Sequence, residues 1–173
     1  VENTLIGSLA GDALTATNEN TAVGKSALSA DTLGSRSTAI GQGTLATQNF
    51  TTATQTYNTA VGFQAGNAVT TGIENTFIGG RAGDALTDAD KNTAVGSEAL
   101  SADTLGNFST AVGRAALANQ NFTSDTDTYN TAVGYNAGLE VTTGIENTFI
   151  GGKAGDALTD ADYNVALGQQ AIT

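Results

Sequence analysis

An internal repeat constrains the fold of this chain more than any other feature. A five-residue motif, most often Asn-Thr-Ala-Val-Gly, begins at residues 3, 20, 37, 58, 75, 92, 109, 130, 147 and 164. The successive spacings are 17, 17, 21, 17, 17, 17, 21, 17 and 17 residues, so four units make a super-repeat of 72 residues. Repetition of this kind is typical of solenoids, in which each unit packs on its sequence neighbours.

The composition of each unit favours strands over helices. The fifth position is Gly in all ten units, the fourth is always Val, Ile or Leu, and the eighth is Ala in every unit except the one with Thr44. Two helices of about five residues per unit would place Gly and β-branched residues in helix interiors, where both are unfavourable. Thr-Ala-Val instead favours a short strand, ended by a Gly that supplies a positive φ or lets another backbone approach closely.

The sequence therefore predicts an all-β fold: a parallel β-solenoid (β-roll) of about ten 17-residue coils, forming a single domain over residues 1–173. The four extra residues of the third and seventh units fall around 51–57 and 123–129, so we expect two loops on the same side of the rod. The chain opens in mid-repeat at Val1 and stops ten residues into the last unit, without visible caps. We expect a segment of a longer array, or a subunit that stacks end to end into a filament.

Composition excludes several functional classes. The chain has no Cys and no His, which excludes a disulfide framework, a zinc finger, a thiol nucleophile and a Ser-His-Asp triad. Six Lys and Arg stand against 17 Asp and Glu, and this net charge of −11 argues against binding to nucleic acid. No apolar run approaches the length of a membrane span. A repeat array distributes its carboxylates instead of converging them, so we expect no enzymatic activity.

The strand residues pose a question about which face is buried. Side chains alternate along a strand, so the second and fourth positions of the motif share one face and the third lies on the other. Either a narrow solenoid buries the third position and exposes Thr and Val, or the Val face is the core and the third position packs on a partner. We expect the second arrangement, because large apolar stripes usually mark interfaces. The predicted oligomer interface is Leu5, Ala22, Ala39, Ala60, Phe77, Ala94, Ala111, Ala132, Phe149 and Ala166.

The motifs resemble those of a known group of proteins. N-T-A-V-G and S-T-A-I-G, continued as Gly-x-x-Ala-Leu in residues 92–100 and followed by Thr-Thr-Gly at 70–72 and 142–144, resemble the tandem repeats of phage tail-fibre and adhesin-like proteins. The last unit, N-V-A-L-G-Q-Q-A at 164–171, is similar to the head repeats of YadA-like trimeric autotransporter adhesins. The resemblance implies a left-handed parallel β-roll, a homotrimer, and display at the cell surface or on a virion.

Two acidic turns are candidates for binding calcium. The spacing Asp-x-Asp-x-Asn places alternating oxygens on one side of a turn, which suits hard Ca²⁺. An EF-hand is excluded, because Thr93 stands where that loop needs Gly and Ala99 where it needs Glu. The alternative is a solvated acidic turn whose Asn belongs to a ladder between coils. The candidate ligands are Asp88, Asp90, Asn92, Asp160, Asp162 and Asn164. We expect no other cofactor.

Two further features of the sequence are candidates for contacts at the protein surface. Phe50, Tyr57, Phe122 and Tyr129 flank the long loops, where they would stack on cell-surface carbohydrate or anchor the loops to the rod. Nine units carry Thr at the second position, and an exposed ladder of this kind resembles the Thr arrays of β-solenoid ice-binding proteins.

The sequence as a whole favours a non-enzymatic extracellular structural or adhesive fibre segment. We expect it to associate with itself, as a homotrimer or an end-to-end filament, and to display its repeated loops for attachment with avidity. The alternative function is ice binding through the Thr ladder.

Overall fold

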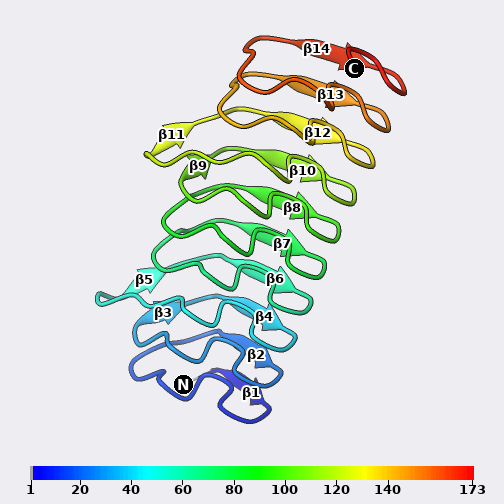
Figure 1. The fold of residues 1–173 in the computed structure, drawn as a ribbon. Helices are drawn as coiled ribbons and strands as arrows, with labels where there is room; N and C mark the ends of the chain where they lie inside the picture. The colour runs from blue at the N-terminus through cyan, green and yellow to red at the C-terminus, as the bar shows by residue number, and fades with distance from the viewer. Residues whose placement is uncertain (1) are drawn as a thin grey trace.

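The structure, a computed structural model, describes residues 2–173 and is a parallel β-solenoid (Figure 1). One short strand from each unit joins a ten-stranded parallel sheet, in which the strands follow one another in chain order. The strands of this sheet are β1 (Thr4–Ile6), β2 (Thr21–Val23), β4 (Thr38–Ile40), β6 (Thr59–Val61), β7 (Thr76–Ile78), β8 (Thr93–Val95), β10 (Thr110–Val112), β12 (Thr131–Val133), β13 (Thr148–Ile150) and β14 (Val165–Leu167). The predicted fold, with one coil per unit, is confirmed.

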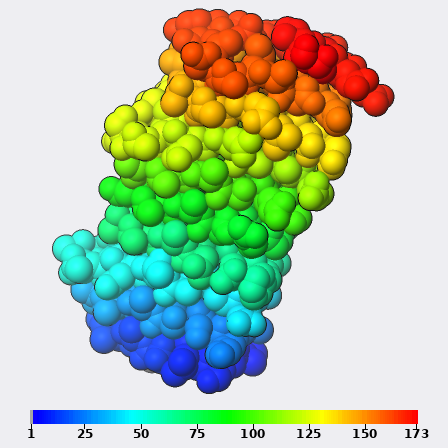
Figure 2. Space-filling model, in the orientation of Figure 1, coloured from blue at the N-terminus to red at the C-terminus, as the bar shows by residue number. Residues whose placement is uncertain are grey.

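The two longer units keep the register of the sheet. Thr38 of β4 pairs with Thr59 of β6 although 21 residues separate them. The extra residues form β5 (Thr54–Gln55) and β11 (Thr126–Asp127), which pair with β3 (Gly34–Ser35) and β9 (Gly106–Asn107) in two small parallel sheets. Both insertions protrude on the same side of the rod (Figures 1 and 2). The predicted pair of loops is therefore confirmed.

The Gly that ends each strand is required for two reasons. Its φ lies between +117° and +145° in all ten units, a region that is essentially reserved for Gly. A Cβ added to Gly96 would also lie 2.5 Å from the carbonyl oxygen of Gly113 in the next coil. Positive φ and close backbone approach, offered by the sequence as alternatives, occur together at this corner.

The third position of the motif lies inside the solenoid. Its Ala and Phe side chains are at most 1% exposed in the single chain, and only Leu5, in the first coil, is exposed at 42%. The opposite wall is built from the eighth-position Ala and from leucines such as Leu28 and Leu100. The prediction of an oligomer interface at these positions is wrong, because the residues are core. They are Ala22, Ala39, Ala60, Phe77, Ala94, Ala111, Ala132, Phe149 and Ala166.

Bulky and small residues compensate for one another inside the rod. A Cβ on Gly83 or Gly66 would lie 2.5 or 2.7 Å from the ring of Phe77. Other coils have Leu at the position of Gly83 and Ala at that of Phe77, as in Leu100 and Ala94. Phe77 therefore fills the space that two glycines leave, one in its own coil and one in the coil before it, and Phe149 does the same between Gly138 and Gly155.

Asparagine side chains tie neighbouring coils together. The Asn75 carboxamide accepts a hydrogen bond from the backbone N–H of Asn92 at 2.9 Å and donates one to the carbonyl oxygen of Ala89 at 2.8 Å. Asn92 repeats the pattern with Ser109 and Gly106. Buried polar groups are stable only when paired, and in these coils the ladder pairs a backbone N–H and a carbonyl.

The rest of each coil contains turns with residues in the left-handed region of φ. The apolar eighth and ninth positions that follow the Gly form a turn and not a second strand, and the ninth-position residues Leu28 and Leu100 have φ of 52°. The residue before each motif from the second unit onward also has positive φ, for example Glu74 at 59°. Non-glycine residues rarely adopt this region, so composition gave no signal for these corners.

Replacing the corner glycine should destabilise the rod. We expect Gly96→Ala to lower the free energy of unfolding by on the order of 3 kcal/mol, from backbone strain and the contact with Gly113. The control is Gly80→Ala, because a Cβ there meets nothing within 4 Å and its φ is not positive. Urea unfolding followed by circular dichroism measures both variants, and equal stability of the two would contradict the argument.

The compensation around Phe77 gives a second prediction. Phe77→Ala should lower the free energy of unfolding by about 3–5 kcal/mol, because it opens a cavity between Gly66 and Gly83. Phe77→Leu should cost clearly less, since Leu5 stands at the same motif position beside Gly11. Similar losses for both variants in urea unfolding would show that the site does not depend on volume.

Candidate functional site

The outer face of the ten-stranded sheet runs along the rod from the first coil to the last. Its fourth-position side chains are half-buried or exposed, with Ile40 at 38%, Ile78 at 41% and Ile150 at 41% exposure. The second position carries Thr in nine coils and Val165 in the last. Neither position holds a charged residue in any coil. We call this surface, made of the second and fourth motif positions, the sheet face.

The threonines of the sheet face keep their hydroxyl groups free. Within residues 2–173, no hydrogen bond engages the hydroxyl of any of these nine side chains. Threonines elsewhere in the coil behave differently: Thr70 donates to the carbonyl oxygen of Thr87 at 3.2 Å, and Thr87 to that of Thr104 at 3.1 Å. The sheet face therefore presents a row of unpaired hydroxyls next to a row of aliphatic side chains, both repeated at the strand spacing of about 4.8 Å.

A column of charged and aromatic residues borders the sheet face. It consists of the residue before each motif, and neighbours along it interact. Arg36 pairs with Glu19 at 2.9 Å and lies 5.5 Å from the ring centre of Tyr57. Phe108 stacks on Tyr129 with ring centres 5.2 Å apart. One face of Tyr57 and one of Tyr129 are thus already covered within the chain.

The four aromatic residues predicted to contact a ligand divide into two pairs. Phe50 and Phe122 are buried, each at 6% exposure, so they anchor the long loops to the rod. Tyr57 and Tyr129 are exposed at 48% and 52%. Only this second pair remains available to a ligand, through the uncovered parts of the rings and the hydroxyls.

Each long coil contains a buried polar network that sequence reasoning missed. The Gln48 amide donates to Asp31 at 2.6 Å and to the Ser37 hydroxyl at 2.9 Å, and it accepts from Asn58 at 2.9 Å. Ser37 also bonds Thr56 at 2.5 Å. Gln120 makes the same contacts in the second super-repeat with Asp103, Ser109, Asn130 and, through Ser109, Thr128.

A signal for this network was present in the sequence. The twelfth position of the unit is Val69 or Leu86 in ordinary coils but Gln48 and Asp31 in the third and second units. The Asp31 carboxylate receives further hydrogen bonds from the backbone N–H groups of Gly34 and Phe50, so its buried charge is met by neutral donors. The network replaces the Asn ladder where Ser37 stands in place of Asn.

The calcium candidates are already engaged within the chain. Asn92 is buried, and both ends of its carboxamide belong to the ladder between coils. Asp90 accepts from the backbone N–H of Ile73 at 2.8 Å, and Thr71 donates to Asp88. Burial raises the pKa of Asp90, and the hydrogen bond from Ile73 opposes this shift. No group of three or more acidic side chains is arranged to hold a metal within residues 2–173.

The second acidic turn shows the same pattern. Asp162 accepts from the backbone N–H of Ile145 at 2.8 Å, and the Thr159 hydroxyl donates to Asp160 at 3.2 Å. Asn164 donates to Asn147 at 3.1 Å. The Asn ladder that the sequence offered as the alternative is therefore confirmed, and calcium binding stays a prediction.

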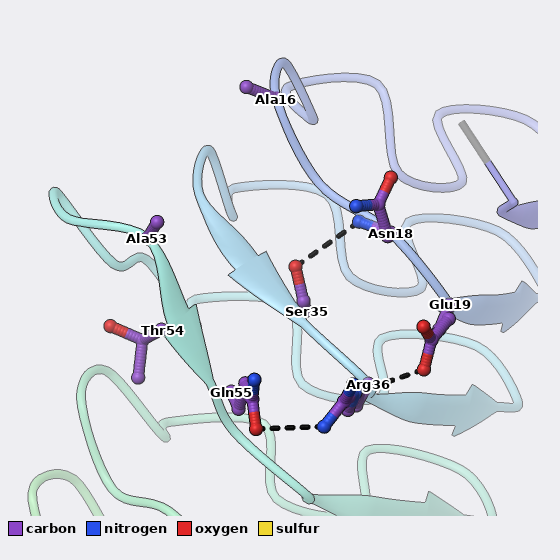
Figure 3. Close-up of a pocket in the computed structure, with 8 residues that line it drawn as sticks. All are labelled: Ala16, Asn18, Glu19, Ser35, Arg36, Ala53, Thr54 and Gln55. Carbon is purple, nitrogen blue, oxygen red and sulfur yellow. Dashed lines mark hydrogen bonds and ion pairs between the residues drawn. The ribbon is translucent and has the colours of Figure 1, made fainter.

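A polar hollow lies where the first long loop overhangs the coils before it (Figure 3). Its volume is about 210 Å³. Ser35 and Arg36 lie between segment 16–19 on one side and segment 53–55 on the other. Arg36 donates to Glu19, to Gln55 at 2.7 Å and to the Tyr57 hydroxyl at 2.6 Å, so the hollow is held together by its own side chains.

Comparisons with known proteins identified no relative of this chain. A scan against protein-family models, a search of curated proteins and a search of solved structures found no match to the chain. Residues 2–173 form no helix with the length and apolar character that crossing a membrane requires.

The buried network gives a prediction about stability. Gln48→Leu should lower the free energy of unfolding by about 3 kcal/mol, because it leaves Oδ2 of Asp31 without a partner inside the rod and removes one hydrogen bond each from Ser37 and Asn58. Val69→Leu, at the equivalent position of a coil without the network, should cost less, because Leu86 occupies that position in the next coil. Urea unfolding compares the two, and a smaller loss for Gln48→Leu would mean that the network contributes little.

Proposed function

We propose that this chain is a non-enzymatic structural segment that associates with other copies of itself through the sheet face and displays its long loops for attachment. The observation that carries the proposal is an uncharged face of Thr and aliphatic side chains, ten strands long, on a chain with a net charge of −11. Exposed apolar surface on this scale usually marks an interface.

Charge distribution selects the sheet face as the place where copies meet. Seventeen acidic side chains against six basic ones make copies repel one another wherever those groups lie. The sheet face carries none of them. Two copies also share one strand spacing, so side chains that fit at one coil fit again at the next. Repeated weak contacts of this kind add up along the rod.

The resemblance to adhesin and tail-fibre repeats supports the remaining parts of the proposal. An extracellular location, at a cell surface or on a virion, a homotrimer and left-handed winding all follow from that resemblance and from no other observation. The last strand, Val165–Leu167, belongs to the unit at 164–171 that is similar to those repeats, and Val165 and Leu167 are exposed, at 70% and 72%.

Charges placed on the sheet face test the proposal. We expect Val95→Lys combined with Val112→Lys, on the adjacent strands β8 and β10, to shift the protein from an oligomer to a monomer. The matched control is Thr51→Lys with Thr123→Lys, which adds the same charge at equivalent exposed sites of the two loops. Light scattering on a sizing column gives the mass of each. A monomeric parent protein, or an unchanged oligomer in the Val variant, would overturn the proposal.

Ice binding is the second candidate, and the free hydroxyls of the sheet face favour it. Nine threonines in register form a regular array of hydroxyl and methyl groups that no protein group engages within residues 2–173. Against it, each of these nine coils supplies only one Thr beside a Val or Ile, and the aliphatic side chains favour a dry contact with another chain.

Substitutions that exchange Thr and Val on the sheet face distinguish self-association from ice binding. Thr93→Val with Thr110→Val keeps the shape but removes hydroxyls, so it should strengthen association; Val95→Thr with Val112→Thr should weaken it. If the face binds ice, an ice-crystal growth assay should give the opposite result: the Thr→Val pair should weaken ice binding, and the Val→Thr pair should strengthen it. A monomeric parent protein that shapes ice crystals would replace self-association as the function.

A further inference from the structure

The polar hollow beside the first long loop combines groups that still have hydrogen-bonding capacity. Within the described residues, no hydrogen bond engages Nε2 of Gln55, Nη2 of Arg36 or Oε1 of Glu19. The Ser35 hydroxyl accepts from the backbone N–H of Asn18 at 3.1 Å and keeps its own proton to donate. The residues that carry these groups line the same small space, and Figure 3 shows them on three successive coils.

The charge of the hollow is balanced. Arg36 and Glu19 form an ion pair at 2.9 Å, and hydrogen bonds from the Arg36 side chain to Gln55 and Tyr57 fix the guanidinium in place. An anion would have to compete with Glu19 for Arg36, and a cation would find one carboxylate, already paired. The hollow therefore suits a neutral ligand that offers both donors and acceptors.

The size of the hollow and the chemistry of its wall narrow the choice of ligand further. A volume of about 210 Å³ is below the range of about 300–1,000 Å³ that is typical for drug-sized ligands. The methyl groups of Ala16 and Ala53 add small apolar patches to the polar wall. A sugar ring has this combination of neighbouring hydroxyls and C–H patches. We propose that the hollow binds one ring of a neutral sugar, such as the terminal residue of a glycan.

The second super-repeat provides a built-in contrast. The residues 72 positions later replace Asn18 by Asp90, Gln55 by Asp127 and Arg36 by Phe108. Asn107 takes the place of Ser35 there and donates to Asp125 at 2.6 Å and to Asp127 at 3.3 Å, while Phe108 stacks on Tyr129. The same backbone thus carries acidic and aromatic groups, which do not reproduce the balanced set of the first loop.

This inference rests on the proposed function, because it gives the attachment role of the loops a place and a class of ligand. It also moves recognition away from the aromatic rings. Arg36 covers one face of Tyr57, so the sugar is held by hydrogen bonds from polar groups on neighbouring coils instead of by stacking.

Sugar binding is tested with methyl glycosides of glucose, galactose, mannose and N-acetylglucosamine, added one at a time to the isotope-labelled protein. We expect at least one of them to shift the amide signals of Ser35, Thr54 and Gln55, with a dissociation constant on the order of 1 mM. Gln55→Asp with Arg36→Phe installs the residues that the fold already carries at 127 and 108, and it should weaken binding at least about tenfold. Asp127→Gln, the matched control in the second loop, should leave the affinity unchanged.

Three results would overturn the inference. They are the absence of shifts with all four glycosides, equal binding by the double variant, and a stronger response to the acidic sugar N-acetylneuraminic acid. Light scattering on the same samples separates this inference from the proposed function. An oligomer that binds no neutral glycoside would remove the sugar site alone, and a monomer that binds one would remove self-association alone.

Discussion

The structure depends on the contact between successive backbones at the glycine that ends each strand. At this corner the Cα of one coil lies so close to the carbonyl of the next that a single added carbon would overlap it. Hydrogen bonds between coils, such as that from Gly96 N–H to the Ile78 carbonyl at 2.7 Å, continue on both sides of the corner. Coils spaced in this way form a parallel sheet, and the sheet in turn fixes which side chains face inward.

Polar side chains maintain this spacing where the backbone alone would leave groups unpaired. The Asn ladder joins coils of 17 residues, and a network centred on Gln48 or Gln120 takes over where the coil lengthens to 21. Buried polar groups of this kind stabilise a structure only when all of them are paired. These networks lie inside the rod and hold its coils together, which leaves recognition to the outer surface.

The outer surface divides into parts of different chemistry. The sheet face is uncharged and combines aliphatic side chains with free hydroxyls, whereas the column beside it alternates charged and aromatic residues such as Glu19, Arg36 and Tyr57. The long loops, which contain β5 and β11, project from another side (Figure 1). The proposed self-association and the proposed attachment therefore involve different groups of the same rod.

The sequence by itself determined the class of fold, the number of coils, the register and the sites of the two loops, because all of these follow from the spacing of the motif. Only the tertiary structure decided which strand face is buried. Alternation shows that Thr93 and Val95 share a face and Ala94 lies on the other, but it does not show which face points inward. The width of the coil decides this, since Leu100 and its equivalents on the opposite wall leave room for Ala, and for Phe77 only where Gly83 replaces Leu. The acidic turns are a second example. Their spacing is visible in the sequence, but only the position of the neighbouring coil shows that the Asn92 side chain is already hydrogen-bonded within the ladder.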